Sequence, residues 1–302
     1  MSTNESKNDF RCGFASIIGR PNVGKSTLLN RFMGQKLSIT SRKPQTTQRR
    51  ILGIKNSIDS QLIFIDTPGM QSKYNDAINQ YMHREIMTAL ADVNIIIFVL
   101  ETLKWTEADE QILDTISAVD MPVLALINKI DKSKKPEKLL PYINDLSKRK
   151  DFVGIIPVSA KNNINIENAE KMIASHLPVG PAEYPPDQLT DRSERFMAAE
   201  FIREKLVRKL GKELPYRITV TIEKFVREED GVTIEAIIWV ESASQKSIVI
   251  GKDGHNLKVV GERARKDLQI MLDAHVLLRT WVKIKKNWSD DSNLLKQFGF
   301  EN

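Results

Sequence analysis

The segment from Gly19 to Ser26 has the residue types and spacing of a phosphate-binding loop. It fits the pattern G-x-x-x-x-G-K-S, in which glycines let consecutive backbone N–H groups turn toward phosphate oxygens. The lysine would reach the β and γ phosphates and act in catalysis, and the serine hydroxyl would coordinate Mg²⁺. A Gly-rich turn that matches by chance is the alternative, but an apolar run before the loop and a helical pattern after it favour the phosphate site. The expected phosphate-binding residues are Gly19, Arg20, Pro21, Asn22, Val23, Gly24, Lys25, Ser26 and Thr27.

A second motif stands at the end of the apolar run Leu62–Ile65. An aspartate at the carboxyl end of a strand can hold Mg²⁺ through a water, and a following glycine can donate its N–H to a γ-phosphate. Alone, such residues form an ordinary turn. After a phosphate-binding loop they predict a sensor of the terminal phosphate, made of Asp66, Thr67, Pro68 and Gly69.

A third group of residues predicts which base is bound. It follows the apolar runs Val123–Ile127 and Val153–Val158. The carboxylate of Asp131 can accept hydrogen bonds from N1–H and the exocyclic amine of guanine, whereas adenine presents an acceptor at N1 and leaves the carboxylate unpaired, which costs ~1–3 kcal/mol. Open α/β sheets bind ligands at the carboxyl ends of their strands, so the three motifs predict one guanine-nucleotide site. The residues of this group are Asn128, Lys129, Asp131, Ser159, Ala160 and Lys161.

Short apolar runs alternate with amphipathic stretches through the first half of the chain. This alternation predicts an α/β domain with a mostly parallel sheet and helices on both faces. Ile51–Ser57 is expected to pair with Leu62–Ile65 as an antiparallel hairpin, because few residues separate the two. The other expected strands are Phe14–Ile18, Ile95–Leu100, Val123–Ile127 and Val153–Val158. The expected helices are Lys25–Met33, Asp76–Ala91, Thr106–Val119, Pro136–Lys148 and Ile166–His176.

The pattern breaks at a cluster of prolines that neither a helix nor a central strand tolerates. We expect a first domain at 1–178 with its core at 13–178, a Pro-rich linker at 179–190 and a second domain at 191–302. Asp191 and Glu194 resemble a capping box that opens a helix to about Leu210. Two alternating strands joined across Glu228–Gly231, a helix at about Gly254–Met271 and a strand at Val276–Ile284 then predict an α+β domain.

The composition is that of an ordinary globular protein. The chain has 302 residues, of which 41% are hydrophobic and 28% charged, so a disordered or fibrous protein is excluded. No apolar run approaches the ~18 residues that span a bilayer, and residues 1–9 are polar, unlike a secretory signal peptide. One cysteine, Cys12, excludes an internal disulfide, and we expect a soluble protein of a reducing compartment. The net charge of +6 permits an anionic partner without proving one.

The first-domain motifs closely resemble the Ras-like GTPase superfamily. That resemblance implies an α/β P-loop fold and makes Ser41–Thr47 the first switch loop, with Thr47, rather than Thr46, completing the Mg²⁺ coordination that Ser26 and Asp66 begin. Met70 replaces the water-orienting Gln that follows Gly69 in Ras-type enzymes, so slow intrinsic hydrolysis is expected. Asn22 matches the position at which several related GTPases hold K⁺ beside the phosphates.

The segment from Ile248 to Gly254 contains I-G-x-x-G and resembles the signature loop of KH domains, in which glycines let the protein backbone approach single-stranded nucleic acid. A simple helix cap by Asp253 is the alternative. Residues 246–266 hold six basic residues against two acidic ones, which favours a phosphate-bearing partner. The expected RNA-binding residues are Ile250, Gly251, Lys252, Asp253, Gly254, Lys258, Arg263 and Lys283.

A Ras-like domain followed by a smaller type II KH domain resembles the bacterial Era GTPases, and the similarity extends to Pro215–Val220 and Trp281. The resemblance implies GTP and GDP as ligands, Mg²⁺ as cofactor and the 3′ end of small-subunit (16S) rRNA as partner. It also implies a role in assembly of the 30S subunit, a monomer when free, and a cytoplasmic location with possible contact to the inner membrane.

Three functions compete on sequence alone. The first is a GTP-dependent switch in which Ser41–Thr47 and Asp66–Tyr74 change how the KH domain meets RNA. The second is a peripheral membrane or protein-binding signalling GTPase whose basic residues meet anionic lipid. The third, an ATP-dependent kinase on the same loop, is disfavoured by the guanine-selective Asp131.

Overall fold

The computed structural model describes residues 10–41, 43, 46–70, 76–210 and 217–300. The chain forms two compact units. The first is built from Met1–Ser38, Arg50–Ser72 and Glu85–Asp191, and the second from Ile39–Arg49, Lys73–Arg84 and Arg192–Asn302, as far as these ranges are described. Two short segments of the amino-terminal half therefore belong to the second unit.

The first unit contains a six-stranded sheet in the order β2-β3-β1-β4-β5-β6. All neighbouring strands are parallel except β2 and β3, which form the expected antiparallel hairpin. The near-continuous Ile, Val and Leu runs of the central strands suit this position, because both faces are covered. The strands are β1 (Arg11–Ile18), β2 (Ile51–Asn56), β3 (Ser60–Asp66), β4 (Ile95–Glu101), β5 (Val123–Asn128) and β6 (Gly154–Pro157).

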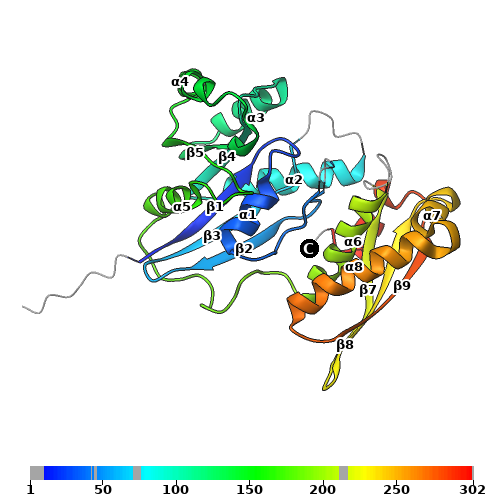
Figure 1. Cartoon of the computed structure of the whole chain (residues 1–302). Helices are drawn as coiled ribbons and strands as arrows, with labels where there is room; N and C mark the ends of the chain where they lie inside the picture. Colours follow the sequence, from blue (N-terminus) through cyan, green and yellow to red (C-terminus); the bar gives the residue numbers. More distant parts are fainter. Residues whose placement is uncertain (1–9, 42, 44–45, 71–75, 211–216, 301–302) are drawn as a thin grey trace, which may run out of the picture. The chain divides into compact units, whose positions relative to one another are not determined.

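Helices cover both faces of this sheet (Figure 1). On one face, α1 packs beside α5, while buried side chains of α2, α3 and α4 join the core on the other. The predicted helix at 136–148 divides into a 3-10 turn, η2 (Pro136–Lys138), and α4. The helices are α1 (Lys25–Met33), α2 (Ala77–Ala91), α3 (Glu107–Ser117), α4 (Leu139–Ser147) and α5 (Ile166–Ser175), with a further 3-10 turn, η1 (Ile130–Lys132).

The expected linker, 179–190, packs along the first unit. The Ile54 N–H donates to the Leu189 carbonyl at 2.9 Å, and Gln61 Nε2 donates to the Tyr184 carbonyl at 2.8 Å. The prolines keep this segment out of regular structure, so its hydrogen bonds go to the edge strand and to side chains.

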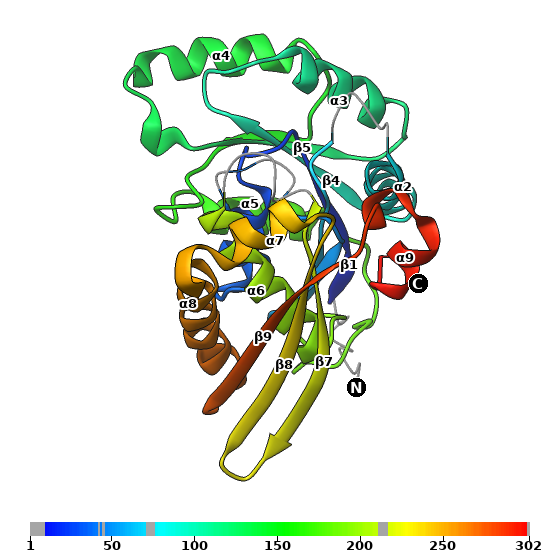
Figure 2. The ribbon, with the colours of Figure 1, turned by 90° about the vertical axis from the view of Figure 1, so that its right-hand side faces the viewer.

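The second unit contains a three-stranded sheet in the order β7-β8-β9, with β7–β8 antiparallel and β8–β9 parallel. Its three longer helices lie on one side of the sheet (Figure 2). The strands are β7 (Thr219–Glu228), β8 (Gly231–Val240) and β9 (Val276–Ile284). The helices are α6 (Glu194–Lys209), α7 (Ala243–Ile250), α8 (His255–Leu272) and α9 (Ser292–Gln297), with 3-10 turns η4 (Lys252–Gly254) and η5 (Trp288–Asp290).

The structure differs from the sequence analysis of the second domain at three points: one expected cap, one helix that was not predicted, and the alternative of a cap by Asp253. The cap of α6 is Ser193, whose side chain accepts from the Phe196 N–H, whereas Asp191 accepts from the Leu52 N–H. Helix α7 was missed, because eight residues show too little periodicity to be recognised. The residue that caps α8 is Gly254, not Asp253.

The later of the two early segments, Lys73–Arg84, contributes to the core of the second unit as far as it is described. Ile78, Tyr81 and Met82 pack in one buried cluster with Trp288 and Phe300, near the carboxyl end of the chain. Leu295 also lies in this cluster, and Leu294 and Phe298 pack against it, so the apolar residues near the end of the chain are part of the core.

Several expected positions lie outside the described residues. They are Arg42, Pro44 and Gln45 of the first switch loop, 71–74 of the second, and Pro215 and Tyr216 of the family-like motif. In the part of the chain that is described, no helix has both the length and the apolar character needed to cross a membrane.

Candidate functional site

The predicted phosphate-binding loop joins the end of β1 to the start of α1, as the motif requires. Asn22 and Gly24 have φ values of 66° and 109°, and this left-handed backbone turns the loop around the helix start. A Cβ on Gly24 would lie 2.3 Å from Asn128 Nδ2, so only glycine fits there. The loop therefore presents the amino end of α1 to an anion.

Lys25 is buried inside this loop. Its Nζ donates to the carbonyls of Gly19 at 2.9 Å and Arg20 at 3.3 Å. Burial lowers the pKa of Lys25 to about 8, although the nearby charge of Asp66 acts in the opposite direction. A bound phosphate would place a negative charge directly beside the Lys25 ammonium, whose positive charge is only weakly compensated in the empty loop.

Asp66 ends β3 inside the protein, where Ser38 Oγ donates to its Oδ2 at 2.7 Å. The next residues are tightly packed: Thr67 Oγ1 donates to the Ile17 carbonyl at 2.9 Å, and a Cβ on Gly69 would lie 2.9 Å from Pro21 Cγ. Chain geometry thus brings the predicted phosphate sensor against the phosphate-binding loop.

The donor chemistry fits Mg²⁺. Ser26 in the first turn of α1 offers a hydroxyl, and Asp66 offers a carboxylate, both hard oxygen ligands. Within the described ranges, no group of three or more His, Cys, Asp or Glu side chains could hold a metal. Mg²⁺ at phosphate sites needs only one or two protein oxygens, because phosphates and waters supply the rest.

The predicted base-recognition residues meet at the carboxyl ends of β5 and β6. Asn128 Nδ2 donates to the Val23 carbonyl at 2.9 Å, and Asn128 Oδ1 accepts from the Ala160 N–H at 3.1 Å. Asp131 is exposed at this edge, and Ser159 Oγ donates to its Oδ1 at 2.6 Å. One oxygen of that carboxylate is thereby fixed in orientation.

Helix α1 also holds the third motif. The guanidinium of Arg31 donates to the carbonyls of Ala160 at 2.9 Å and Lys161 at 3.0 Å. Because α1 begins in the phosphate-binding loop, these contacts set the distance between the phosphate and base ends of the site.

Sequence reasoning missed Glu101, at the end of β4. Its carboxylate accepts from Arg20 Nη2 at 2.9 Å and from Lys129 Nζ at 3.2 Å, and Lys129 Nζ also donates to the Asn22 carbonyl at 2.5 Å. Burial alone would raise the pKa of Glu101, but the hydrogen bond from Arg20 and the charge of Lys129 hold the pKa below its ordinary value. An acidic residue at the carboxyl end of a central strand was the available signal.

The two candidate switch threonines belong to the second unit. Thr46 Oγ1 lies 2.6 Å from Ser41 Oγ, and the Thr46 carbonyl accepts from Arg203 Nη2 at 2.5 Å. Thr47 is buried, and Met70 packs in the core of the first unit. The first switch segment is therefore held by α6 in this structure.

The predicted GxxG element joins α7 to α8 through η4. Gly251, Asp253 and Gly254 all have positive φ, at 74°, 51° and 75°. A Cβ on Gly251 would lie 2.7 Å from the side chain of Asn256, whose Nδ2 donates to the Ile248 carbonyl at 3.0 Å. The loop is thus a rigid turn with exposed Lys252 at its tip.

A groove of about 330 Å³ runs beside this turn, lined by Gly254, Lys258 and Leu278 among others. Two predicted RNA-binding residues lie elsewhere: Arg263 lines a separate pocket, and Lys283 lies over the Trp239 ring at 5.9 Å. Strand alternation places Lys283 on the sheet face away from the helices, since its neighbour Val282 is buried.

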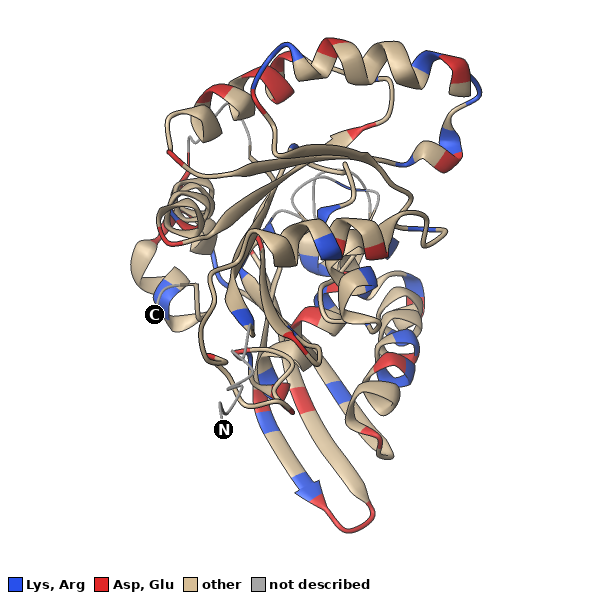
Figure 3. Cartoon of the chain, turned by 90° about the vertical axis from the view of Figure 1, so that its left-hand side faces the viewer, with Lys and Arg blue, Asp and Glu red and all other residues tan. Residues whose placement is uncertain are grey.

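Figure 3 shows basic and acidic residues interspersed on α8 and an acidic tip on the β7–β8 hairpin. The sequence at that tip is Glu228, Glu229 and Asp230. The hairpin tip is therefore unsuited to contact with phosphates, and the helical side of the sheet carries the candidate nucleic-acid groove.

Comparison with known proteins covers both units. A family model described as "50S ribosome-binding GTPase" matches residues 14–129, and a KH-domain model matches 213–289. The chain is 50% identical to GTPase Era of Marinobacter nauticus over 289 residues, which cover 96% of this chain and 95% of the relative. It is 46% identical to GTPase Era of Pseudomonas aeruginosa over 290 residues, with the same coverage.

The chain belongs to the Era family of GTPases. Its fold agrees with two solved Era structures at a TM-score of 0.93 and 36% identity, each covering 97% of this chain and 100% of the solved one. One is a variant of Aquifex aeolicus Era bound to GDP.AlF4-, and the other is Era in complex with MgGDPNP and nucleotides 1506–1542 of 16S ribosomal RNA. The Ras-like and KH expectations for the fold are confirmed.

Proposed function

We propose that this chain binds GTP with Mg²⁺, hydrolyses it to GDP and phosphate, and binds the 3′ end of 16S rRNA. The observation that carries the nucleotide part is the arrangement around Asn128, whose amide joins the phosphate-binding loop at Val23 to the base end at Ala160. Beside it, Asp131 presents an oriented carboxylate to a guanine.

The phosphate end follows from the same geometry. Backbone N–H groups of Gly19–Ser26 receive the phosphates, and Lys25 gives them a charge-assisted hydrogen bond. Ser26 and Asp66 would hold Mg²⁺, with Thr47 as the further ligand in the triphosphate state. The bound ion would neutralise charge that develops on the terminal phosphate.

Slow intrinsic hydrolysis is part of the proposal, because Met70 is apolar and buried and cannot orient a water. A K⁺ ion beside Asn22 would supply positive charge next to the phosphates. We expect hydrolysis to be faster in KCl than in NaCl of equal ionic strength, and N22G, which removes the side-chain oxygen but keeps the positive φ, to abolish the difference. Equal rates of the unaltered protein in both salts would contradict the K⁺ site.

The RNA part rests on the GxxG turn, its groove and Era in complex with 16S rRNA as a full-length structural relative. The first-domain family description names the 50S particle, but the relative that matches the whole chain carries small-subunit RNA. We therefore propose a role in 30S assembly, carried out in the cytoplasm by a monomer.

The alternative is a signalling GTPase that meets anionic membranes or proteins through the same basic residues. K252E distinguishes the two: we expect it to weaken crosslinking to a 16S 3′-end oligonucleotide and to leave binding to phosphatidylserine vesicles unchanged. Unchanged RNA crosslinking with weaker vesicle binding would favour the signalling GTPase that meets membranes.

A nucleotide-dependent switch further requires that RNA affinity differ between the GDP and GTP states. Equal RNA affinity with GDP and with a GTP analogue would contradict the switch.

The nucleotide proposal is tested by D131N. An Asn side chain cannot accept both guanine hydrogen bonds, but its amide can donate to the second carbonyl of xanthine. We expect GTP affinity to fall ~100-fold and xanthosine triphosphate affinity to rise, because a site built for a hydrogen bond rejects a ligand that lacks it. The control is D145N, which alters an exposed carboxylate on α4. Unchanged base preference in D131N would refute the proposal.

A further inference from the structure

A second basic cavity lies in the second unit, apart from the GxxG groove. Its volume is about 170 Å³, and side chains of α6 and α8 line it. Each water in liquid takes ≈ 30 Å³, so the cavity has room for a tetrahedral oxyanion with part of its hydration shell. The lining residues are Lys205, Arg208, Arg263, Lys266 and Asp267.

The floor of this pocket is a buried and fully paired lysine. Lys205 Nζ donates to Glu204 Oε2 at 2.8 Å and also to Asp267. Burial works against the charged form, but the hydrogen bonds with Asp267 and Glu204 raise the pKa of Lys205 above its ordinary value. The floor therefore stays cationic at physiological pH, with its charge compensated.

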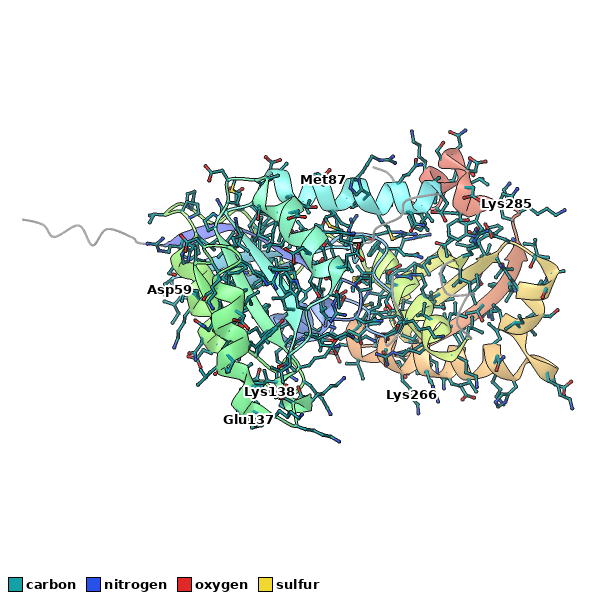
Figure 4. The ribbon with its side chains drawn as sticks, turned by 90° about the horizontal axis from the view of Figure 1, so that it is seen from above. Asp59, Met87, Glu137, Lys138, Lys266 and Lys285 are labelled. Carbon is teal, nitrogen blue, oxygen red and sulfur yellow. The ribbon has the colours of Figure 1, made fainter. Side chains whose placement is uncertain are left out.

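The rim carries the charge that is left over. Arg263 and Lys266 stand on the outer side of α8 and have no carboxylate partner among the residues that the structure describes. Figure 4 labels Lys266 on this exposed side of the helix. Lys205 and Arg208 together balance the carboxylates of Glu204 and Asp267. The positive charges of Arg263 and Lys266 are therefore the excess charge of the pocket.

The same pocket wall holds Thr40, the residue just before the predicted first switch loop. Arg208 Nε and Nη2 donate to the carbonyl and Oγ1 of Thr40, both at 2.8 Å, and the Thr40 N–H donates to Glu204 Oε1 at 2.9 Å. Glu204 Oε1 also accepts from Arg208 Nη2 at 2.9 Å. A ligand that binds the Arg208 guanidinium inside the pocket must therefore weaken the hydrogen bonds from Arg208 to Thr40.

We propose that this pocket binds a phosphate group between Arg208, Arg263 and Lys266, and that the phosphate competes with Thr40 for Arg208. Guanidinium groups pair with phosphate oxygens through two parallel N–H donors, which suits this pair of arginines. A free phosphate compound and the backbone of bound RNA offer the same chemistry. The RNA source rests on the proposed function, whereas the oxyanion site itself does not.

The test uses the full chain saturated with GDP and Mg²⁺, so that the nucleotide loop is occupied. Inorganic pyrophosphate is titrated calorimetrically against the unaltered protein, against R263Q/K266Q and against K134Q/K135Q. The last variant removes the same charge from an exposed loop of the first unit. We expect R263Q/K266Q to lose at least tenfold in affinity and the control variant to lose little. Hydrogen exchange at the Thr40 amide should become faster when pyrophosphate binds.

A second arm identifies the source. Affinity for a single-stranded 16S 3′-end oligonucleotide is measured over a salt series, and two lost phosphate contacts should reduce the slope of log K against log salt by ~1.4 in R263Q/K266Q. A reduced slope supports RNA as the source, whereas an unchanged slope combined with the loss of pyrophosphate affinity in R263Q/K266Q supports a free anion. Equal pyrophosphate binding and equal slopes in all three proteins would overturn the proposal. Failure of RNA binding as a whole, with pyrophosphate binding retained, would count against the proposed function instead.

Discussion

The titration of Lys25 gives a sharp test of the phosphate site. Burial lowers its pKa to about 8, and only the protonated form can donate a charge-assisted hydrogen bond to a phosphate. When a bound phosphate raises that pKa, the apparent dissociation constant of GDP scales as one plus ten to the power (pH − 8). It should rise ~4-fold from pH 7 to pH 8.5.

Fluorescence titration of GDP with Mg²⁺ between pH 7 and 8.5 measures this slope and stays below the range in which guanine N1–H ionises. K25R is the matched control, because arginine remains charged throughout and should remove the slope. A dissociation constant that is flat across this range in the unaltered protein would refute the assigned state of Lys25.

The same shift affects stability with a definite sign. A lysine whose folded pKa lies below its unfolded value of 10.5 destabilises the native state at pH 7, by ~3 kcal/mol for this shift, and the penalty disappears as pH rises from 8 to 10.5. Replacing the buried ammonium by an apolar side chain in K25M should therefore raise the free energy of unfolding of the nucleotide-free protein at pH 7, while nucleotide binding is lost. A less stable K25M would contradict the burial argument.

Three further predictions follow from single contacts. In E101Q, the ion pairs with Arg20 and Lys129 are each weakened by about 1 kcal/mol after screening, so GTP affinity measured by calorimetry should fall by up to ~30-fold relative to E107Q on the exposed face of α3. Equal affinities of the two variants would exclude a positioning role for Glu101. G24A would place a Cβ 2.3 Å from Asn128 Nδ2 and should weaken GTP binding at least tenfold. The control G34A is also at positive φ but has no atom within 4 Å of the added Cβ, so it should cost only about 1 kcal/mol of stability. Equal effects of the two variants on GTP binding would show that backbone strain matters and the contact with Asn128 does not. R203M removes the ion-pair partner of the buried Glu200 and should lower the free energy of unfolding, measured by urea titration, by about 3–5 kcal/mol. A loss below about 1 kcal/mol would mean that Glu200 is reached by water or pairs with another group.

Most of the first domain could be predicted from patterns of residues close together in the sequence. The strand, loop and helix around Lys25 depend on residues close together in sequence, so the α1 bounds at Lys25–Met33 agree with the prediction. Asp66 and Asn128 each end a buried strand, and the rule that parallel strands present their carboxyl ends together was enough to expect them on one edge.

The second domain shows where local pattern is insufficient. Helix α7 has only eight residues, so the sequence after its cap, Ser242, is too short to show a clear helical periodicity of apolar residues. Asp191 has the residue type and spacing of a cap, but a hydrogen bond from Leu52, distant in sequence, decides its place. Such competition between local and long-range partners cannot be read from spacing.

By itself, then, the sequence determined the chemistry of the motifs and the class of both folds, because phosphate loops, strand ends and the GxxG turn are encoded within a few neighbouring residues. Only the tertiary structure decided that Glu101 accepts hydrogen bonds from both Arg20 and Lys129. It also decided that side chains of α6 form hydrogen bonds with Thr40 and Thr46. It also separated Arg263 and Lys283 from the GxxG groove. These contacts depend on side chains that meet only after distant elements pack, and no periodicity along the chain records them.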